Sequence, residues 1–330
     1  MKNSSVSLAA PTRSGPATRA LITLAICAAI GVASILLLDL AGTDYAFLAA
    51  YTVLQFVALA TAWNILGGYA GYVNFGVAGF FGVGVYTSVV IYKTLQWPLI
   101  FTIPLAALVT GLLGLAMGYL TLRLRGVFFS IATLAMSVVL NTLIVNWAFV
   151  GGSRGVYVLH PETMPYFGTY ARYLFVVMFV IAVGSVLIAR FIEHSWIGNG
   201  LAALKDDEMA AECAGVPSLR MKLLATTISG ALLGAVGAPF PYFITYVDPT
   251  SAFSLTIAVN AIAMPLIGGT ATWLGPVIGA LLLGTLQQVA TVTISSALNL
   301  LIVGVLLVVF ITVAPNGIIG FIKDMREKRK

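Results

Sequence analysis

Long apolar runs separated by short polar intervals dominate this sequence. The first run, residues 20–38, contains no charged residue, and an α-helix needs about 20 such residues to cross the hydrocarbon core of a bilayer. No clear cleavage site follows this run, so we expect it to be a retained helix and not a signal peptide. The pattern predicts about ten membrane-spanning helices, at residues 20–38, 45–66, 67–92, 98–122, 127–150, 173–191, 223–247, 254–267, 274–289 and 298–313.

Composition separates a membrane protein from a soluble one here. Hydrophobic residues make up 60% of the 330 residues and charged residues only 8%, whereas soluble domains carry about 25% charged residues. A soluble core cannot accommodate so much apolar surface. We therefore predict an all-α, polytopic membrane helical bundle, in which several spans are broken by glycine- and proline-rich segments.

The placement of the basic residues predicts the orientation of the bundle. Ten spans with both termini inside put only Lys93, Arg154 and Arg172 of the 17 Lys and Arg residues on the outer side. Cytoplasmic loops are enriched in Lys and Arg, so this bias favours an N-in, C-in topology. The expected parts are a cytoplasmic tail at 1–19, a transmembrane domain at 20–314 and a basic cytoplasmic tail at 315–330.

The longest polar interval between the spans is residues 193–222, which falls on the cytoplasmic side of this topology. Within it, four of the 11 acidic residues fall in seven positions, Asp206, Asp207, Glu208 and Glu212. We predict a short helix here, capped by Asp206 or Asp207 and closed by a left-handed Gly215. Ser218 is expected to cap the next span. Such a short helix is unstable alone in water, so it should pack against a partner or neighbouring loops.

The expected interior of the bundle is polar but uncharged. In this topology no Asp, Glu, Lys, Arg or His lies near the bilayer midplane, where each would cost roughly 2.5–3.5 kcal/mol or more. Proton-coupled transport needs such groups and is therefore disfavoured. Neutral side chains remain as candidates for a path for a polar solute, although each alone could simply bond neighbouring helices. The candidates are Asn64, Tyr69, Asn74, Thr133, Asn141 and Asn260.

Motifs for chemistry are missing from the sequence. No lysine follows a glycine, so there is no phosphate-binding loop of the Walker A type. Cys27 and Cys213 are not expected to pair, and no His/Cys spacing suggests a metal site. We therefore expect no catalytic residue, metal or cofactor in this chain. Any ATP that drives it would be hydrolysed by another polypeptide.

Several segments resemble one family of transporters. Glu208-Met209-Ala210-Ala211 followed by Gly215 is similar to the "EAA" loop of ABC importer permeases, in the spacing found in branched-chain amino acid permeases of the LivM/LivH type. Three further segments, in the order and spacing typical of that family, extend the resemblance over about residues 50–290. They are Asn64-Ile65-Leu66-Gly67-Gly68-Tyr69-Ala70-Gly71, Gly151-Gly152-Ser153-Arg154-Gly155 and Ile267-Gly268-Gly269.

The resemblance implies a membrane-spanning permease subunit of an ATP-driven importer in the bacterial inner membrane. Its cargo would be branched-chain or related amino acids, or amide-like small polar solutes, delivered by a periplasmic solute-binding protein. Its other partners would be a homologous permease subunit and two ATP-binding subunits that hold ATP and Mg²⁺, with no role for nucleic acid. The resemblance assigns ATPase coupling to the loop 193–222, through Lys205, Asp206, Asp207, Glu208, Ala211 and Gly215.

Departures from the family pattern leave the cargo open. Val77 stands where many members have His, Asn74 replaces a common Ser, and Ser137 and Val138 occupy a region that is often acidic. Two other classes are alternatives: an ion-coupled secondary transporter, whose uptake would survive loss of any ATPase, and a passive channel for urea or another small solute, which would conduct alone. A membrane enzyme is the third and least favoured alternative, since the sequence shows no catalytic constellation.

Overall fold

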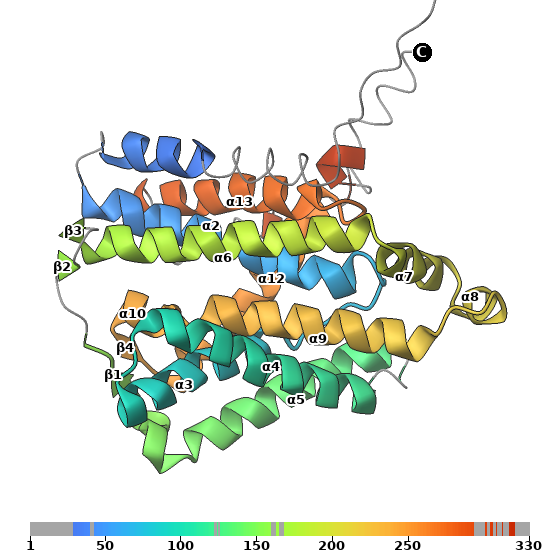
Figure 1. Ribbon diagram of the computed structural model, residues 1–330, viewed down its shortest axis with the longest axis horizontal. Helices are drawn as coiled ribbons and strands as arrows, with labels where there is room; N and C mark the ends of the chain where they lie inside the picture. Colours follow the sequence, from blue (N-terminus) through green and yellow to red (C-terminus); the bar gives the residue numbers. More distant parts are fainter. Residues whose placement is uncertain are drawn as a thin grey trace, which may run out of the picture. The chain divides into compact units, whose positions relative to one another are not determined.

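The computed structural model describes residues 29–39, 43–121, 124, 126–159, 163–164 and 168–293, with positions 301, 304–305, 308, 312 and 317–320. The chain divides into two units, Met1–Thr43 and Asp44–Lys330. In the first, the described residues form an apolar helix over Ala29–Asp39. The second unit carries the bundle shown in Figure 1.

Within the described residues, eight helical segments are long and apolar enough to cross a membrane, which confirms the polytopic all-α bundle. The expected first span lies partly, and the expected tenth largely, outside the described residues, so the count of ten stays a prediction. The segments are α2 (Asp44–Gly67), α3 (Val77–Leu95), α4 (Leu99–Thr121), α5 (Val127–Val145), α6 (Tyr170–Glu193), α9 (Ser218–Gly237) with α10 (Phe240–Ile244), α11 (Pro249–Ala252) with α12 (Leu255–Gly268), and α13 (Leu274–Thr293).

The two ends of the bundle differ. At one end, on the right in Figure 1, lie two short helices, α7 (Trp196–Asp206) and α8 (Glu208–Cys213); we call this the α8 end. The opposite end carries the 3-10 turns η1 (Ala148–Val150) and η2 (Gly152–Arg154) and two antiparallel strand pairs. The pairs are β1 (Val156–Tyr157) with β4 (Tyr246–Val247), and β2 (Thr163–Met164) with β3 (Gly168–Thr169).

The core of the bundle is built around α2 and α3. Trp63 on α2 and Phe81 on α3 are among the largest fully buried side chains, and α2 packs against α6, α9, α12 and α13. By contrast, only 22% of the membrane window of α5 is buried, against 67% for α3. Side chains such as Leu112 on α4 and Val138 on α5 face outward, as suits helices in contact with lipid.

Glycines allow the closest helix crossings. A Cβ on Gly84 of α3 would lie 2.3 Å from the carbonyl oxygen of Gly234 on α9, and a Cβ on Gly114 of α4 would lie 2.8 Å from that of Thr226. Small residues at such crossings let two backbones touch and gain dispersion contacts that larger residues would prevent. Gly84 and Gly114 are therefore packing residues at helix crossings.

The expected boundaries of two spans were wrong. Residues 67–84, the glycine-rich part of the predicted span 67–92, were expected to form a distorted helix near the path. Instead, α2 ends at Gly67, residues 68–76 are not helical, and α3 is regular from Val77. The glycines inside α3 are packing residues: a Cβ on Gly79 would meet Ser137, and one on Gly82 would meet the ring of Phe253. The seventh span begins at Ser218 and not at residue 223, so that Lys222 lies within α9.

Candidate functional site

The short helix α8 is capped at both ends. Oδ1 of Asp207 accepts hydrogen bonds from the backbone N–H groups of Met209 (2.9 Å) and Ala210 (3.0 Å), which satisfies donors that a helix start leaves unpaired. Gly215 has φ +88°, the left-handed conformation expected after a helix. These two expectations are confirmed, with Asp207 as the cap and Asp206 as the last residue of α7.

Ser218 has a different role from the expected one. Pro217 occupies the N-cap position of α9 and Ser218 is the first residue of the helix. The hydroxyl of Ser218 donates instead to the carboxylate of Glu212. Because Ser218 already has helical geometry, its side chain bonds α8 and does not cap its own helix; the predicted cap was wrong.

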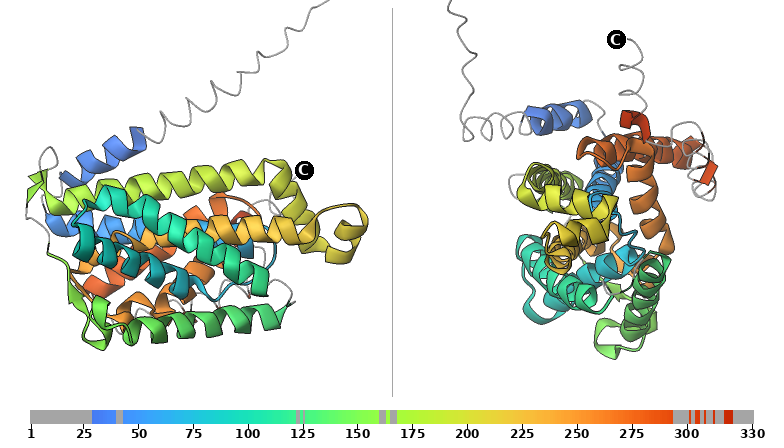
Figure 2. Two further views of the ribbon diagram at one scale, coloured as in Figure 1. Left: turned by 60° about the horizontal axis from the view of Figure 1, so that its bottom comes forward. Right: turned by 90° about the vertical axis from the view of Figure 1, so that its right-hand side faces the viewer.

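One face of α8 is buried and the other is exposed. Ala211 is buried against the end of the bundle, whereas the side chain of Met209 is 66% exposed. Asp206, Asp207 and Cys213 are also exposed. In Figure 1 and in the left view of Figure 2, α8 extends beyond the ends of the long helices. An apolar side chain next to carboxylates on a projecting helix is suited to docking on another protein.

Residues 68–76, which we call the connector, join α2 to α3 at the α8 end. Nζ of Lys205 on α7 donates to the carbonyl oxygen of Gly68 (2.8 Å). The hydroxyl of Tyr69 donates to Oε2 of Glu193, the last residue of α6 (3.2 Å). The same Oε2 accepts from the backbone N–H of Trp273 (2.5 Å). The connector is thus tied to the ends of α6 and α7 and, through Glu193, to the α12–α13 turn.

Burial controls the protonation of Tyr69. Removal of this side chain from water, reinforced by the neighbouring Glu193 carboxylate, raises the pKa of the Tyr69 hydroxyl far above its usual value, because both effects disfavour a phenolate. The hydroxyl therefore remains protonated, and a donor, throughout the physiological pH range.

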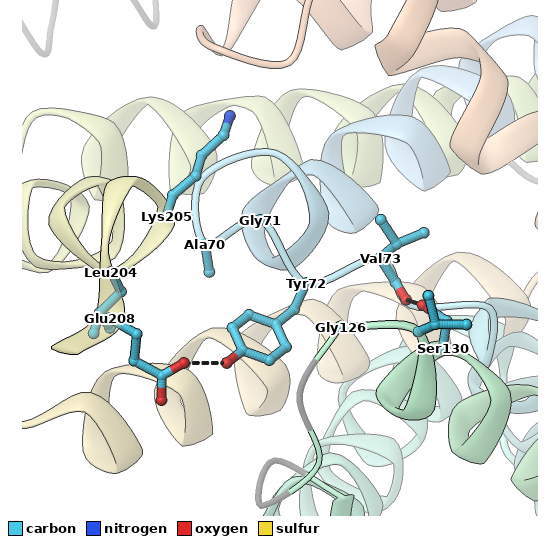
Figure 3. A pocket seen from close by; sticks show the side chains of 10 residues that line it. Ala70, Gly71, Tyr72, Val73, Gly126, Ser130, Leu204, Lys205 and Glu208 are labelled. Carbon is cyan, nitrogen blue, oxygen red and sulfur yellow. Dashed lines mark hydrogen bonds between the residues drawn. The ribbon is translucent and has the colours of Figure 1, made fainter.

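A buried triad, which we call the Tyr72 triad, joins the connector to α8 and α9. Nζ of Lys222 donates to Oε1 of Glu208 (2.6 Å) and to the hydroxyl oxygen of Tyr72 (2.6 Å). The hydroxyl of Tyr72 in turn donates to Oε2 of Glu208 (2.7 Å), as Figure 3 shows. The side chains of Lys222 and Glu208 are only 3% and 19% exposed. Water therefore screens this ion pair much less than a surface pair.

The inner side of the connector is bonded to α2 and α5. Nε1 of Trp63 donates to the carbonyl oxygen of Asn74 (2.9 Å), and Oδ1 of Asn74 accepts from the N–H of Gly76 (2.7 Å). Oγ1 of Thr133 accepts from the N–H of Phe75 (3.2 Å). These bonds satisfy the polar groups of a non-helical segment that is largely buried, as burial requires.

The structure brings together four of the six predicted path residues. Asn64 is fully buried on α2, next to Gly68, and Tyr69, Asn74 and Thr133 lie on or against the connector. The other two lie elsewhere. Nε2 of Gln287 on α13 donates to Oδ1 of Asn260 on α12 (3.1 Å), which is a helix-to-helix bond, and Asn141 lies on α5. Their assignment to a transport path stays a prediction.

A cavity of about 380 Å³ lies where the connector, the start of α5 and the α7–α8 corner meet. Figure 3 shows its polar side chains. Those of Ser130, Lys205 and Glu208 are already bonded within the protein, to the carbonyl oxygens of Val73 and Gly68 and to the Tyr72 triad. Among the described residues, no group of three His, Cys, Asp or Glu side chains is placed to hold a metal ion.

Sequence reasoning did not identify Glu193, Tyr72 and Lys222 as site residues, nor α7 as a separate helix. The positive charge of Lys222 was one signal in the sequence that could have indicated this site. Positive charges are unfavourable near a helix N-terminus, where the helix dipole is positive. A lysine one turn into α9, in an almost uncharged span, therefore needed an acidic partner.

The fold and this site define a class of protein. A polytopic bundle of apolar helices, with one capped, partly acidic helix projecting at one end, is the organisation of a multi-pass membrane protein with an exposed helix at the end of its spans. Residues 45–311 match the family described as "Branched-chain amino acid transport system / permease component", and the chain belongs to this family. It is a membrane permease subunit of an ABC importer and a multi-pass protein of the bacterial inner membrane.

Individual relatives agree with this family assignment. The chain is 25% identical over 289 residues to the high-affinity branched-chain amino acid transport system permease protein LivM of Salmonella typhimurium, covering 80% of this chain and 67% of the relative. It is 25% identical over 266 residues to a probable branched-chain amino acid transport permease protein LivH of Methanocaldococcus jannaschii, covering 75% and 82%. A comparison with solved structures found no match.

Proposed function

We propose that this subunit imports branched-chain or related amino acids, or amide-like small polar solutes, that a periplasmic binding protein delivers. It would work beside a homologous permease subunit and two ATP-binding subunits. Those subunits would hold the ATP and Mg²⁺, and this chain would need no cofactor of its own. Family membership supports the proposal, because the LivM and LivH relatives are named for branched-chain amino acid transport.

The observation that carries the ATPase partnership is the preformed, projecting α8. A six-residue helix does not persist alone in water, but the caps at Asp207 and Gly215 and the buried Ala211 hold this one in place. The binding surface is therefore ordered before a partner arrives, which lowers the entropic cost of docking. Exposed Met209 would enter the ATPase cleft, with Asp206 and Asp207 at the rim of the contact.

The predicted path would run past the connector. Asn64, Asn74 and Thr133 supply neutral polar groups there, and neutral groups bind a zwitterionic solute without trapping it through full charges. Asn141 and Asn260 would extend the same path along α5 and α12.

Transport in proteoliposomes tests the proposal directly. With the binding protein and L-leucine outside and ATP inside, the complete complex should accumulate leucine only when ATP is hydrolysed. Uptake that survives removal of the ATP-binding subunits but requires an ion gradient would identify an ion-coupled transporter. Downhill flux through the purified chain alone would identify a channel. Either result would contradict the proposal.

Two substitutions can distinguish the helix-capping role of the Asp207 side chain from the effect of its negative charge. Asp207→Asn keeps a good capping group and removes the charge, whereas Asp207→Ala removes both and should weaken α8 by roughly 0.5–2 kcal/mol. We expect Asp207→Ala to lose more ATPase binding than Asp207→Asn, measured by co-purification with the ATP-binding subunits. Equal loss in the two variants would show that charge, and not helix capping, determines docking.

Cys213 offers a direct probe of the docking face, since it is exposed on α8. In a Cys27→Ser background, a bulky maleimide should modify Cys213 of the free permease readily and should react at least several-fold more slowly once the ATP-binding subunits are bound. The labelling rates in detergent are read by gel shift, with denatured protein as the control for full reactivity. An unchanged rate in the assembled complex would contradict docking through α8.

A further inference from the structure

We infer that the Tyr72 triad is a relay: it transmits the position of α8 to α5 through the connector, so that an ATPase moving α8 also moves the start of α5. The inference rests on the proposed function. In it, Tyr72, Glu208 and Lys222 are positioning residues that act through α5, and none of them contacts the cargo.

The first link joins α8 to the connector. Glu208 is the first residue of α8, and both of its carboxylate oxygens are used within the chain, one by Tyr72 and one by Lys222. Charge-assisted bonds of 2.6–2.7 Å are short and strong. Glu208 therefore holds the connector from inside the chain, while Met209 and Asp207 keep the exposed side of α8 available to a partner.

The second link joins the connector to α5. The ring of Tyr72 packs edge-on against Phe129, with centroids 5.2 Å apart. Oγ of Ser130 donates to the carbonyl oxygen of Val73 (2.8 Å), and Oγ1 of Thr133 accepts from the N–H of Phe75 (3.2 Å). Three residues at the start of α5 are thus bound to the part of the connector that the triad holds.

The third observation is the low burial of α5. Only 22% of its membrane window is buried, the lowest share among the described spans. A helix with few buried contacts shifts at a lower cost than a core helix such as α3. The contacts form a continuous chain from α8 through Tyr72 to α5, and such chains carry energetic coupling between distant sites. The predicted path residues Thr133 and Asn141 lie on the helix that would move.

The test uses the complete importer in proteoliposomes, with L-leucine, its binding protein and ATP. The main variant combines Glu208→Gln with Lys222→Met, which removes both charges of this ion pair together. The second is Tyr72→Phe, which keeps the ring on Phe129 and deletes only the hydroxyl. In both, we expect unchanged co-purification with the ATP-binding subunits and a fall of about tenfold in leucine taken up per ATP hydrolysed, within the usual range for coupling between sites.

Ser218→Ala is the matched control, because it deletes a second side-chain bond between α8 and α9, that of Ser218 to Glu212, and does not change the connector. We expect its uptake per ATP to match the wild type. Lys222→Arg keeps the ion pair and should retain most of the coupling. If the double variant and Tyr72→Phe both transport with the wild-type ratio, the relay is wrong. If Ser218→Ala is as uncoupled as they are, the triad only fastens α8 to α9.

A labelling experiment tests the relay without any cargo. Val127, the first residue of α5, is 72% exposed. In a background with Cys27→Ser and Cys213→Ser, the reactivity of Val127→Cys in the ATPase complex should change on adding ATP, and Tyr72→Phe should abolish the change. A nucleotide response that survives Tyr72→Phe contradicts the relay. The labelling assay contains no leucine, so its outcome does not depend on the identity of the cargo. If the wild-type importer failed to take up leucine, the proposed cargo would be rejected, but the labelling result would still test the relay.

Discussion

Lys222→Met is expected to lower the free energy of unfolding by about 3–5 kcal/mol, the usual cost of removing one partner from a buried ion pair. Lys222 is 3% exposed and its ammonium group neutralises a Glu208 carboxylate that is only 19% exposed. Without Lys222, that carboxylate stays largely buried with Tyr72 as its remaining partner in the triad. Adding Glu208→Gln should recover most of the loss, because a buried neutral amide costs less than a buried unpaired charge.

Denaturant unfolding of the purified permease in detergent micelles measures these effects. Lys205→Met is the matched control: its lysine is exposed and donates one hydrogen bond to Gly68, so we expect a loss below about 1 kcal/mol. Lys222→Met, Glu208→Gln and their combination form a double-mutant cycle. Its coupling energy should be at least about 0.5 kcal/mol, the lower limit for residues in contact. Equal effects of Lys222→Met and Lys205→Met would contradict a buried ion pair.

Local chemistry explains what the sequence could predict. A span is recognised because about 20 apolar residues satisfy their backbone only as a helix in lipid, a property that belongs to each segment alone. The caps at Asp207 and Gly215 were predictable for the same reason, since a cap needs only its own helix. Both features were found as expected.

The Tyr72 triad could not be predicted in this way. Its residues are separated by as many as 150 positions, and only the packing of α8 and α9 on the connector brings them together. The resemblance to the EAA loop placed Glu208, together with its acidic neighbours Asp206 and Asp207, among the residues that couple to a partner. Which of several adjacent carboxylates faces inward depends on the tertiary fold.

The same limit explains the wrong interpretation of the glycine-rich segment. A cluster of glycines is compatible with a distorted backbone and equally with a regular helix in close contact with others. The neighbours decide between the two, and for α3 these are Ser137, Phe253 and Gly234, all distant in sequence. Only the part before Val77 is irregular.

Gly84→Ala should be among the most damaging single-methyl additions to this bundle. The new Cβ would lie 2.3 Å from the carbonyl oxygen of Gly234 and 2.6 Å from its Cα. Both are backbone atoms, so no side chain can rotate away and α3 must separate from α9. Overpacking usually costs about 1–3 kcal/mol, and we expect a loss at the upper end of this range or above it, because α3 is the most buried of the described spans.

Gly184→Ala on α6 adds the same methyl group where, apart from the neighbouring backbone of α6 itself, no atom lies within 4 Å of the new Cβ. It should be neutral or slightly stabilising, since Ala is favoured over Gly inside a helix by about 1 kcal/mol. Expression level and denaturant midpoint, compared for the two variants in the same detergent, measure the difference. Equal midpoints for Gly84→Ala and Gly184→Ala would mean that the α3–α9 crossing is looser than the structure shows.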